Sequence, residues 1–236
     1  MRIDKFLSEC GVATRREAQA AGKRGQISVS GAVVKDVSRH IDPELDEVVY
    51  NGRRIEYRRF TYVMLNKPEG YVSATEDSKL PVVTELLSPE LQRMGLFPVG
   101  RLDRDTVGLM ILTNNGSLAH AVLSPRRHVE KVYYFKCAAP LDSAAEEIFL
   151  ESITLKDGYE CKSAKLLADG DRLGGFITLT EGKYHQIKRM LAAINNRVTF
   201  LERVRFGGIA LDGSLARGEY RLLTKDEEAL LISHDN

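Results

Sequence analysis

Long apolar runs and clustered cysteines are both missing from this sequence, and each absence excludes a class of protein. No stretch approaches the roughly 20 apolar residues of a membrane span, and the opening segment MRIDKFLSEC lacks the apolar core of a secretory signal. The three cysteines, Cys10, Cys137 and Cys161, stand far apart, with no CxxC pair and no Cys/His cluster at metal spacing. We therefore expect a cytoplasmic protein with reduced thiols, no membrane partner and no metal site.

A strong excess of charge of one sign is also missing, because the formal net charge of the 236 residues is only +1. Residues 1–60 hold 12 Lys and Arg against 9 Asp and Glu, which leaves a small negative excess in the remainder. Charge alone therefore argues only weakly for a nucleic-acid partner. The 43% of hydrophobic and 28% of charged residues are ordinary for a folded protein, and the length suits a small module joined to a larger one.

The amino-terminal segment shows the pattern helix, helix, hairpin. Apolar side chains recur at i, i+3, i+4 and i+7 across residues 3–10, which predicts a short amphipathic helix. The run TRRE at residues 14–17 has the form of a capping box and predicts that a second helix begins there. Residues 27–29 and 33–34 carry strand patterns on either side of a Ser-Gly turn, so we expect a hairpin.

The amino-terminal segment carries several positively charged side chains. The second helix would display Arg15 and Arg16 near its start and Lys23 and Arg24 at its far end, on one edge where phosphates could bind. A solvated helix face accounts for the same residues without any ligand. If the segment binds RNA, its candidate contacts are Arg2, Lys5, Arg15, Arg16, Lys23 and Arg24.

The order of these features resembles the S4 RNA-binding domain, whose pattern runs from R-x-D-x-x-L through a TRREA-like helix to a G-x-V-x-V-N-G hairpin. The matching residues are Arg2, Asp4, Leu7, Gly25, Ile27, Val29 and Gly31. Two departures are Ser30, where Asn is usual, and Gly22 within the second helix. Ser is poorer than Asn at positive φ and an interior Gly costs about 1 kcal/mol, so we expect a module less stable than most, which does not exclude RNA binding.

The stretch NGRRIEYRRF at residues 51–60 is polar and basic and opens with a turn dipeptide, which suits an inter-domain linker. We place a domain boundary near residue 58, with an S4-like domain at 1–58 and a larger domain at 59–236. In the larger domain the strand candidates TYVML, GLMILT, KVYYFKC, GFITLT and VTFLERV alternate irregularly with helical patterns. This order favours an α+β fold with a mixed or antiparallel sheet flanked by helices.

The run GRLDRDTVGL at residues 100–109 places carboxylates in a glycine-bounded loop before a strand. Taken alone, Asp103 and Asp105 are explained as loop carboxylates that cap a turn or pair with arginine. The exchange of an N-glycosidic bond for a C-glycosidic bond also needs a carboxylate at the sugar, either to attack the anomeric carbon or to remove a sugar proton. The local chemistry leaves both interpretations open.

The pattern G-R-L-D-x-D-T-x-G-L resembles the signature loop of pseudouridine synthases of the RsuA and RluA superfamily, with every fixed position filled. The resemblance implies that Asp103 is the catalytic residue and that Asp105 and Thr106 support the loop. The segment EKVY at residues 130–133 is similar to the family's E-K-T-Y segment, which implies that Tyr133 stacks on an extruded base in the active site. A strand tyrosine otherwise packs in the core.

The segment EGKYHQIKRM at residues 181–190 resembles E-G-[RK]-Y-H-Q-[VI]-K-R-M of the RsuA subgroup. The resemblance implies that Lys188 pairs with Asp103, and that Ile187 packs near the uracil. Lys183 and Arg189 would meet phosphates. Without the resemblance, this stretch is an amphipathic helix with a basic face.

Two further features fit the family. The turn LNKPEG at residues 65–70 resembles the family's L-N-K-P-x-G turn, and we expect it to close the fold near the site rather than to take part in chemistry. Asn195 stands after the last motif helix, where Gly is usual. Asn tolerates the left-handed conformation that such a helix end needs, so we expect the geometry to be preserved.

Together the motifs imply an RsuA-family isomerase that converts a specific uridine of 16S ribosomal RNA to pseudouridine without a cofactor. In the implied mechanism Arg101 inserts toward the vacated base stack. Tyr133 and Ile187 sandwich the uracil, and Asp103 promotes glycosidic cleavage, either by covalent attack or through a glycal intermediate. The expected partner is ribosomal RNA, free or within a pre-ribosomal particle, and the protein is expected to act as a monomer.

Two alternatives compete with this prediction. A 23S rRNA pseudouridine synthase of the RluB, RluE and RluF branch would use the same site, although the YHQIKRM string and the short end after LLTKDEEALLISH favour the 16S subgroup. A non-catalytic S4-type assembly factor for rRNA would show decay of the catalytic loop. The residues Arg101, Leu102, Asp103, Tyr133 and Lys188 are all intact.

Overall fold

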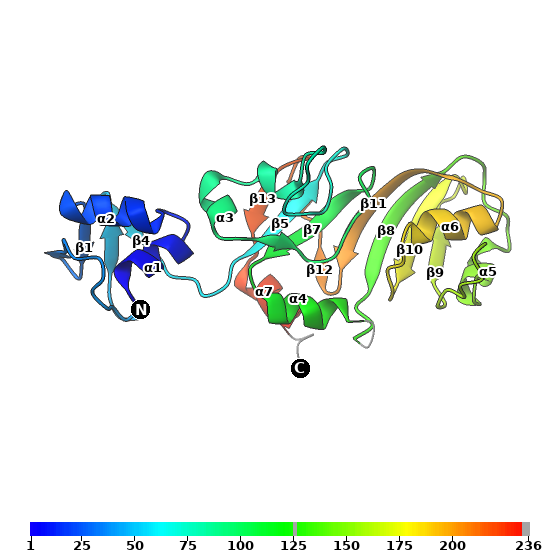
Figure 1. Ribbon diagram of the computed structural model, residues 1–236. Coiled ribbons are helices and arrows are strands. Elements are labelled where there is room, and N and C mark those ends of the chain that lie inside the picture. Colours follow the sequence, from blue (N-terminus) through cyan, green and yellow to red (C-terminus); the bar gives the residue numbers. More distant parts are fainter. Residues whose placement is uncertain (125–126, 233–236) are drawn as a thin grey trace. The chain divides into compact units, whose positions relative to one another are not determined.

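The computed structural model describes residues 1–124 and 127–232 (Figure 1). Residues 233–236, the last part of the segment that favoured the 16S subgroup, lie outside this range. Contacts divide the chain into two compact units, Met1–Thr61 with Thr84–Phe97, and Tyr62–Val83 with Pro98–Asn236. The boundary near residue 58 stays a prediction. Among the described helices, none has both the length and the apolar character needed to cross a membrane.

The helices and strands include the two amino-terminal helices, the hairpin and the five strands predicted from the sequence. The first unit contains α1 (Ile3–Glu9), α2 (Arg15–Lys23), β1 (Ile27–Val29), β2 (Ala32–Val33), β3 (Val48–Tyr50), β4 (Arg53–Ile55) and α3 (Pro89–Arg93). The short η1 (Val83–Leu86) and β6 (Phe97–Pro98) lie at the junctions between the units along the chain. The second unit contains β5 (Tyr62–Lys67), β7 (Val107–Thr113), α4 (Gly116–Leu123), β8 (Lys131–Cys137), α5 (Ala145–Leu150), β9 (Lys165–Ala168), β10 (Gly174–Leu179), α6 (Gln186–Ala193), β11 (Val198–Phe206), β12 (Ile209–Ala210), β13 (Tyr220–Leu222) and α7 (Lys225–Ile232).

In the first unit α1 and α2 accompany an antiparallel sheet of order β2-β1-β3-β4. The predicted capping box begins α2, because the Glu17 amide donates to Thr14 Oγ1 at 3.2 Å and the Thr14 amide donates to Glu17 Oε2 at 2.7 Å. The predicted hairpin joins β1 to β2, with Ser30 at φ 49° and Gly31 at φ 84°. Ser30 therefore takes the left-handed conformation in which Asn would be less strained.

The packing of α2 explains why a glycine stands at position 22, while the lower stability expected for this module stays a prediction. A Cβ built on Gly22 would lie 2.7 Å from the Lys35 carbonyl oxygen and 2.8 Å from Val37 Cγ1. Backbone atoms cannot move aside as the end of a flexible side chain can, so α2 packs this closely on the 35–37 segment only because residue 22 has no side chain. The helix-propensity penalty is offset by tertiary packing.

The prediction of a linker over residues 51–60 was wrong for its first half. Asn51 and Gly52 have φ values of 50° and 78° and join β3 to β4 as a tight hairpin, so residues 53–55 belong to the first sheet. Asn-Gly is favoured in two-residue hairpins because both of its positions accept positive φ. The dipeptide signalled a hairpin, not the start of a linker.

The second unit is built on one mixed sheet, which confirms the predicted α+β fold. Its main path runs β13-β5-β7-β11-β8-β10-β9, and β12 pairs with β11. The pairs along this path are antiparallel except β7 with β11, which run parallel. Since β5 and β7 are buried along their whole length, the core of the unit lies around these central strands.

Gly108 permits the parallel pairing at the centre of the sheet. The register places Gly108 beside Arg203, and a Cβ at Gly108 would press on the Arg203 carbonyl oxygen and lie 2.9 Å from the Arg203 amide nitrogen. Its φ of 97° is also one that side chains rarely adopt. The amino end of β7, which the 100–106 loop enters, therefore lies beside the middle of β11, the strand that follows α6.

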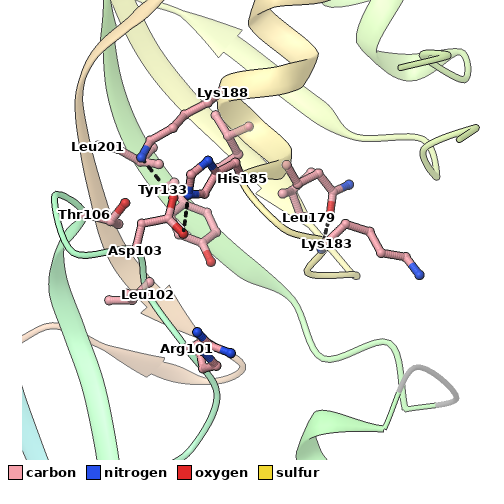
Figure 2. A pocket seen from close by; sticks show the side chains of 12 residues that line it. Arg101, Leu102, Asp103, Thr106, Tyr133, Leu179, Lys183, His185, Lys188 and Leu201 are labelled. Atoms are coloured by element: carbon pink, nitrogen blue, oxygen red, sulfur yellow. Dashed lines mark hydrogen bonds and ion pairs between the residues drawn. The ribbon is translucent and has the colours of Figure 1, made fainter. Parts of the chain in front are cut away.

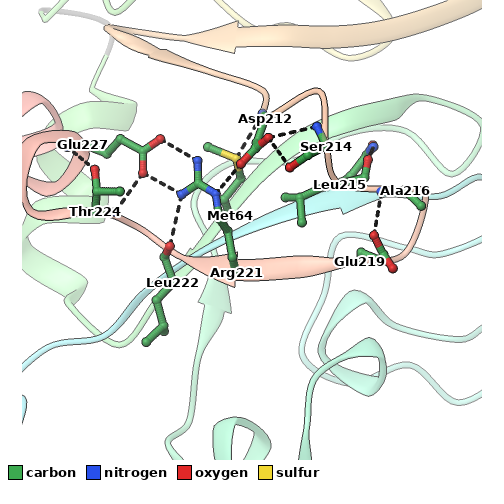
Figure 3. Close-up of polar contacts among 11 residues, drawn as sticks. Met64, Asp212, Ser214, Leu215, Ala216, Glu219, Arg221, Leu222, Thr224 and Glu227 are labelled. Atoms are coloured by element: carbon green, nitrogen blue, oxygen red, sulfur yellow. Dashed lines mark hydrogen bonds and ion pairs between the residues drawn. The ribbon is translucent and has the colours of Figure 1, made fainter.

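A network of charges ties the carboxyl-terminal helix to this sheet (Figure 3). Arg221 on β13 donates from Nε to Asp212 Oδ2 at 2.7 Å, and from Nη1 and Nη2 to the two Glu227 carboxylate oxygens at 2.7 and 2.8 Å. Hydrogen bonds from Ser214 and Arg221 lower the pKa of Asp212 to about 2. The bidentate geometry fixes α7 against β13.

Candidate active site

The 100–106 loop, the strand β8 and the start of α6 line one cleft in the second unit (Figure 2). Its empty volume is about 390 Å³, open mouth included. The lining residues are Arg101, Leu102, Asp103, Thr106, Tyr133, Leu179, Lys183, His185, Gln186, Ile187, Lys188 and Leu201. The cleft thus brings together Asp103, all four residues predicted to bind the target nucleotide, and Lys183.

Asp103 faces two positively chargeable side chains from α6 and the turn before it. Lys188 Nζ lies 2.9 Å from Asp103 Oδ2 and 2.6 Å from Asp105 Oδ1, and His185 Nε2 lies 3.6 Å from Asp103 Oδ1. Burial acts to lower the pKa of Lys188, but hydrogen bonds to Asp105 and Asp103 outweigh it and raise that pKa. Burial acts to raise the pKa of Asp105, and the Lys188 hydrogen bond outweighs this and lowers it. The cleft therefore presents a carboxylate whose rotamer a lysine cation holds.

Lys67 stabilises the same loop from beneath, which is the fold closure predicted for the LNKPEG turn. The side chain is fully buried at the end of β5. Its Nζ donates to the carbonyl oxygens of Pro68 at 3.1 Å, Asp103 at 3.1 Å, Arg104 at 3.2 Å and Thr106 at 2.8 Å. Burial lowers the pKa of Lys67 to about 8, against the opposing effect of the nearby carboxylates. The sequence did not reveal that this turn reaches the backbone of the 100–106 loop.

Tyr133 is held from below by a buried cation that the sequence interpretation missed. Tyr133 lies on β8 and is 9% exposed in the cleft. Arg203 on β11 is 2% exposed, and its Nε donates to the Leu109 carbonyl oxygen at 2.8 Å. Burial lowers the pKa of Arg203, while its hydrogen bond with Tyr133 opposes that shift. Strand periodicity could have indicated the burial of Arg203, because Arg203 lies on the same face of β11 as the buried Leu201.

The turn before α6 is fixed by buried polar groups. Gln186 accepts from the Lys183 amide at 2.9 Å and donates from Nε2 to Glu181 Oε1 at 2.5 Å. Glu181 also accepts from the Tyr159 hydroxyl at 2.8 Å, which raises the pKa of Tyr159 to about 12. After α6, Asn195 has φ 57°, which confirms the predicted left-handed helix end.

The remaining cations predicted to bind RNA fall into two groups. Three of them have acidic partners: Arg2 with Asp4 at 2.7 Å, Lys5 with Glu9 at 3.5 Å, and Arg189 with Asp157 at 2.5 Å. The others are exposed, namely Arg15, Arg16, Lys23, Arg24 and Lys183, and Lys183 Nζ lies over the Tyr159 ring at 4.7 Å. RNA contact by both groups stays a prediction.

Comparisons with known proteins identify the family. Residues 61–193 match the RNA pseudouridylate synthase family, and residues 1–48 match the S4 domain. The chain is 43% identical to an uncharacterized RNA pseudouridine synthase of Bacillus subtilis, YtzG, over 234 residues and 98% of both chains. It is 37% identical to ribosomal small subunit pseudouridine synthase A of Escherichia coli over 233 residues, covering 98% of this chain and 100% of that protein. A crystal structure of a pseudouridylate synthase superposes with a TM-score of 0.69 and 36% identity, covering 98% of this chain and 99% of the other.

The chain therefore belongs to the RNA pseudouridylate synthase family, as its motifs predicted. It is an RNA pseudouridine synthase, an isomerase with an RNA-binding S4 domain ahead of its catalytic part.

Proposed function

We propose that the enzyme converts uridine 516 of 16S ribosomal RNA to pseudouridine. The support is its full-length similarity to relatives named ribosomal small subunit pseudouridine synthase A, together with the YHQIKRM string of its α6 segment. We further propose that it works as a monomer in the cytoplasm, on ribosomal RNA that is free or packed in a pre-ribosomal particle. Equilibrium sedimentation of the enzyme with and without RNA tests the monomer.

The proposed mechanism gives each cleft residue one task. Arg101 fills the stack that the extruded uridine leaves, while Tyr133 and Ile187 sandwich the uracil. Asp103 promotes cleavage of the N-glycosidic bond at the sugar, and the freed uracil turns over. Its carbon 5 then bonds to the same sugar carbon, the proton displaced from carbon 5 leaves to solvent, and N1 takes up one proton. The reaction is an isomerisation, so atoms and electrons balance without a cofactor. The observation that carries this proposal is the 2.9 Å ion pair between Lys188 and Asp103 within the aromatic-lined cleft.

The target is tested by mapping pseudouridines with carbodiimide and primer extension in ribosomal RNA from cells that lack this protein. Loss of the signal at position 516 of 16S RNA is expected. Loss of a 23S signal with an intact 16S pattern would move the enzyme to the large-subunit branch. Re-expression of the wild-type chain should restore the missing modification, which ties the loss to this protein.

The catalytic carboxylate is tested by Asp103→Asn, which keeps the size of the side chain and removes its charge. We expect this variant to fold and bind RNA, yet to release no tritium from RNA that carries 5-tritiated uridine. The matched control is Asp226→Asn, since Asp226 is an exposed carboxylate at the start of α7 and does not line the cleft. The control should keep most of the activity. Substantial release by Asp103→Asn would refute the assignment.

The exposed cations of α2 are proposed to contact RNA phosphates. The double variant Arg15→Glu and Arg16→Glu should weaken rRNA binding and flatten its dependence on salt, because fewer counterions are released on binding. Both side chains lie outside the core of the first unit, so the fold should persist. Affinity and salt dependence equal to those of the wild type would show that these arginines face solvent and do not contact the RNA.

A further inference from the structure

The ring of Tyr184 is unusually exposed for an aromatic side chain beside an active site. It is 75% exposed. It stacks on the imidazole of His185, with ring centroids 3.8 Å apart and planes within 17°. A ring that leaves most of its surface in water adds little to the stability of the fold, and its uncovered face is available to a flat partner.

The backbone around this stacked pair is fixed. His185 sits in the left-handed conformation at φ 49°, and Gln186 pins the preceding turn through the Lys183 amide. Arg189 Nη1 donates to the Tyr184 carbonyl oxygen at 3.4 Å while the same guanidinium pairs with Asp157. A left-handed histidine carries backbone strain that the surrounding contacts must hold. The two rings are therefore presented by an ordered turn.

The pair forms part of a groove that continues from the catalytic cleft. The groove is lined by Val72, Ser73, Arg101, Leu102, Asp103, Arg104, Asp105, Gly182, Lys183, Tyr184, His185 and Lys188. Asp103, His185 and Lys188 line both the groove and the cleft. Because His185 Nε2 lies 3.6 Å from Asp103, the stacked pair begins directly beside the position of the target nucleotide. The cations of the groove match a phosphate backbone.

We propose that Tyr184 and His185 form a stacking platform for the base of the nucleotide adjacent to the target uridine. This inference rests on the proposed roles of Asp103 and the cleft, and it adds a subsite for single-stranded RNA. Every nucleobase has a π face, so the platform accepts any base and sets the path of the strand rather than its sequence. Lys183 lines the same groove, where it neutralises a phosphate next to the stacked nucleotide.

The test combines a change in the protein with a change in the RNA. The substrate is a short RNA around the uridine whose modification disappears in cells lacking the protein. If the 16S assignment is wrong, a different RNA sequence is used and the design of the test stays the same. Two further RNAs carry an abasic nucleotide immediately before or after that uridine. We expect Tyr184→Leu to raise KM for the intact RNA roughly tenfold or more, with kcat nearly unchanged, and Tyr184→Phe to retain wild-type values.

The decisive comparison is made on the abasic RNAs. For one of the two, the wild-type enzyme should lose about the same factor in kcat/KM that Tyr184→Leu loses on intact RNA, and Tyr184→Leu should lose nothing more. An equal additional loss by Tyr184→Leu on both abasic RNAs, or no effect of Tyr184→Leu on intact RNA, would overturn the platform. Because intact RNA reports the activity of the wild type separately, failure of the catalytic assignment is distinguishable from failure of this subsite.

A matched control removes an exposed ring elsewhere in the same unit. Phe176 on β10 is 40% exposed, and it pairs with Tyr134 while its neighbour Ile177 pairs with Tyr133. Since successive strand residues face opposite sides, Phe176 lies on the face away from the cleft. Phe176→Leu should leave KM for all three RNAs unchanged. A rise equal to that of Tyr184→Leu would show that loss of any exposed ring weakens binding.

Discussion

Replacing Lys67 by methionine should separate the geometry of the catalytic loop from the stability of the fold. Methionine keeps the length and most of the volume of the lysine stem but carries no donor. Four carbonyl oxygens then lose the ammonium group, three of them on the loop that holds Asp103. We expect kcat to fall about 100-fold, because a displacement on the order of 1 Å at a reacting group costs about that factor.

The effect on stability should be much smaller, since two contributions oppose each other. Lowering the pKa of Lys67 from 10.5 to about 8 corresponds to roughly 3 kcal/mol that the fold loses by keeping the ammonium charged, and methionine recovers it. Against this, the Thr106 carbonyl is left without its donor, at about 1–3 kcal/mol. The Asp103 and Arg104 carbonyls keep their bonds from the amides of Thr106 and Gly70. The net change is about 2 kcal/mol or less.

Two measurements on Lys67→Met test this reasoning. Urea unfolding should place the variant within about 2 kcal/mol of the wild type, and calorimetry should place its melting temperature within roughly 8 °C. Single-turnover tritium release at saturating enzyme reports the chemical step without contributions from binding. Wild-type turnover by a folded Lys67→Met enzyme would refute the claim that the ammonium positions the loop. A loss of stability far above 2 kcal/mol would refute the energy balance.

Two further predictions concern pH and packing. The folded-state pKa of Lys67 is depressed, so between pH 8 and 10.5 the unfolded chain holds a proton that the folded chain has released. The stability of the wild type should therefore rise relative to Lys67→Met as pH rises across this window, by up to about 3 kcal/mol, and this gain should be lost as pH falls through about 8. Urea unfolding at pH 7 and 9.5 will measure it. Gly22→Ala should destabilise the first unit by about 1–3 kcal/mol despite the better helix propensity of alanine, because its Cβ would meet the Lys35 carbonyl at 2.7 Å. A variant that is more stable than the wild type in thermal unfolding would contradict this packing argument.

Local patterns in the sequence were sufficient to predict most of the elements. β-rich composition located β5, β7, β8, β10 and β11, and the Thr14 to Glu17 box located the start of α2. The pairing of these strands could not be predicted in the same way, because the partners of a strand are set by tertiary packing. The Asn51-Gly52 turn illustrates the limit: the dipeptide was noticed, but whether it joined strands or domains depended on contacts outside it.

The residues of the candidate site differ in how far the sequence could predict them. The contact between Asp103 and Lys188 leaves no local trace in the chain and was predicted only through the family's motifs. Lys67 and Arg203 escaped prediction as buried cations, because lysine and arginine are rarely buried. The sequence placed Lys67 in a turn and Arg203 in a strand candidate without indicating the burial of either. Their burial is explained by what they support, which is the loop carbonyls in one case and the Tyr133 hydroxyl in the other.

The parallel contact between β7 and β11 also bears on the order in which we expect the site to assemble. Strand β7 and the Asp103 loop are synthesised well before α6 and β11, and only the pairing of Gly108 with Arg203 closes the centre of the sheet. Parallel pairing between distant segments forms slowly, because the entropy of closing the long loop is lost before the stabilising contacts form. A partly folded or nascent chain therefore carries Asp103 without Lys188. We therefore expect folding to bring Asp103 and Lys188 together only in a late step, along with the completed core of the second unit.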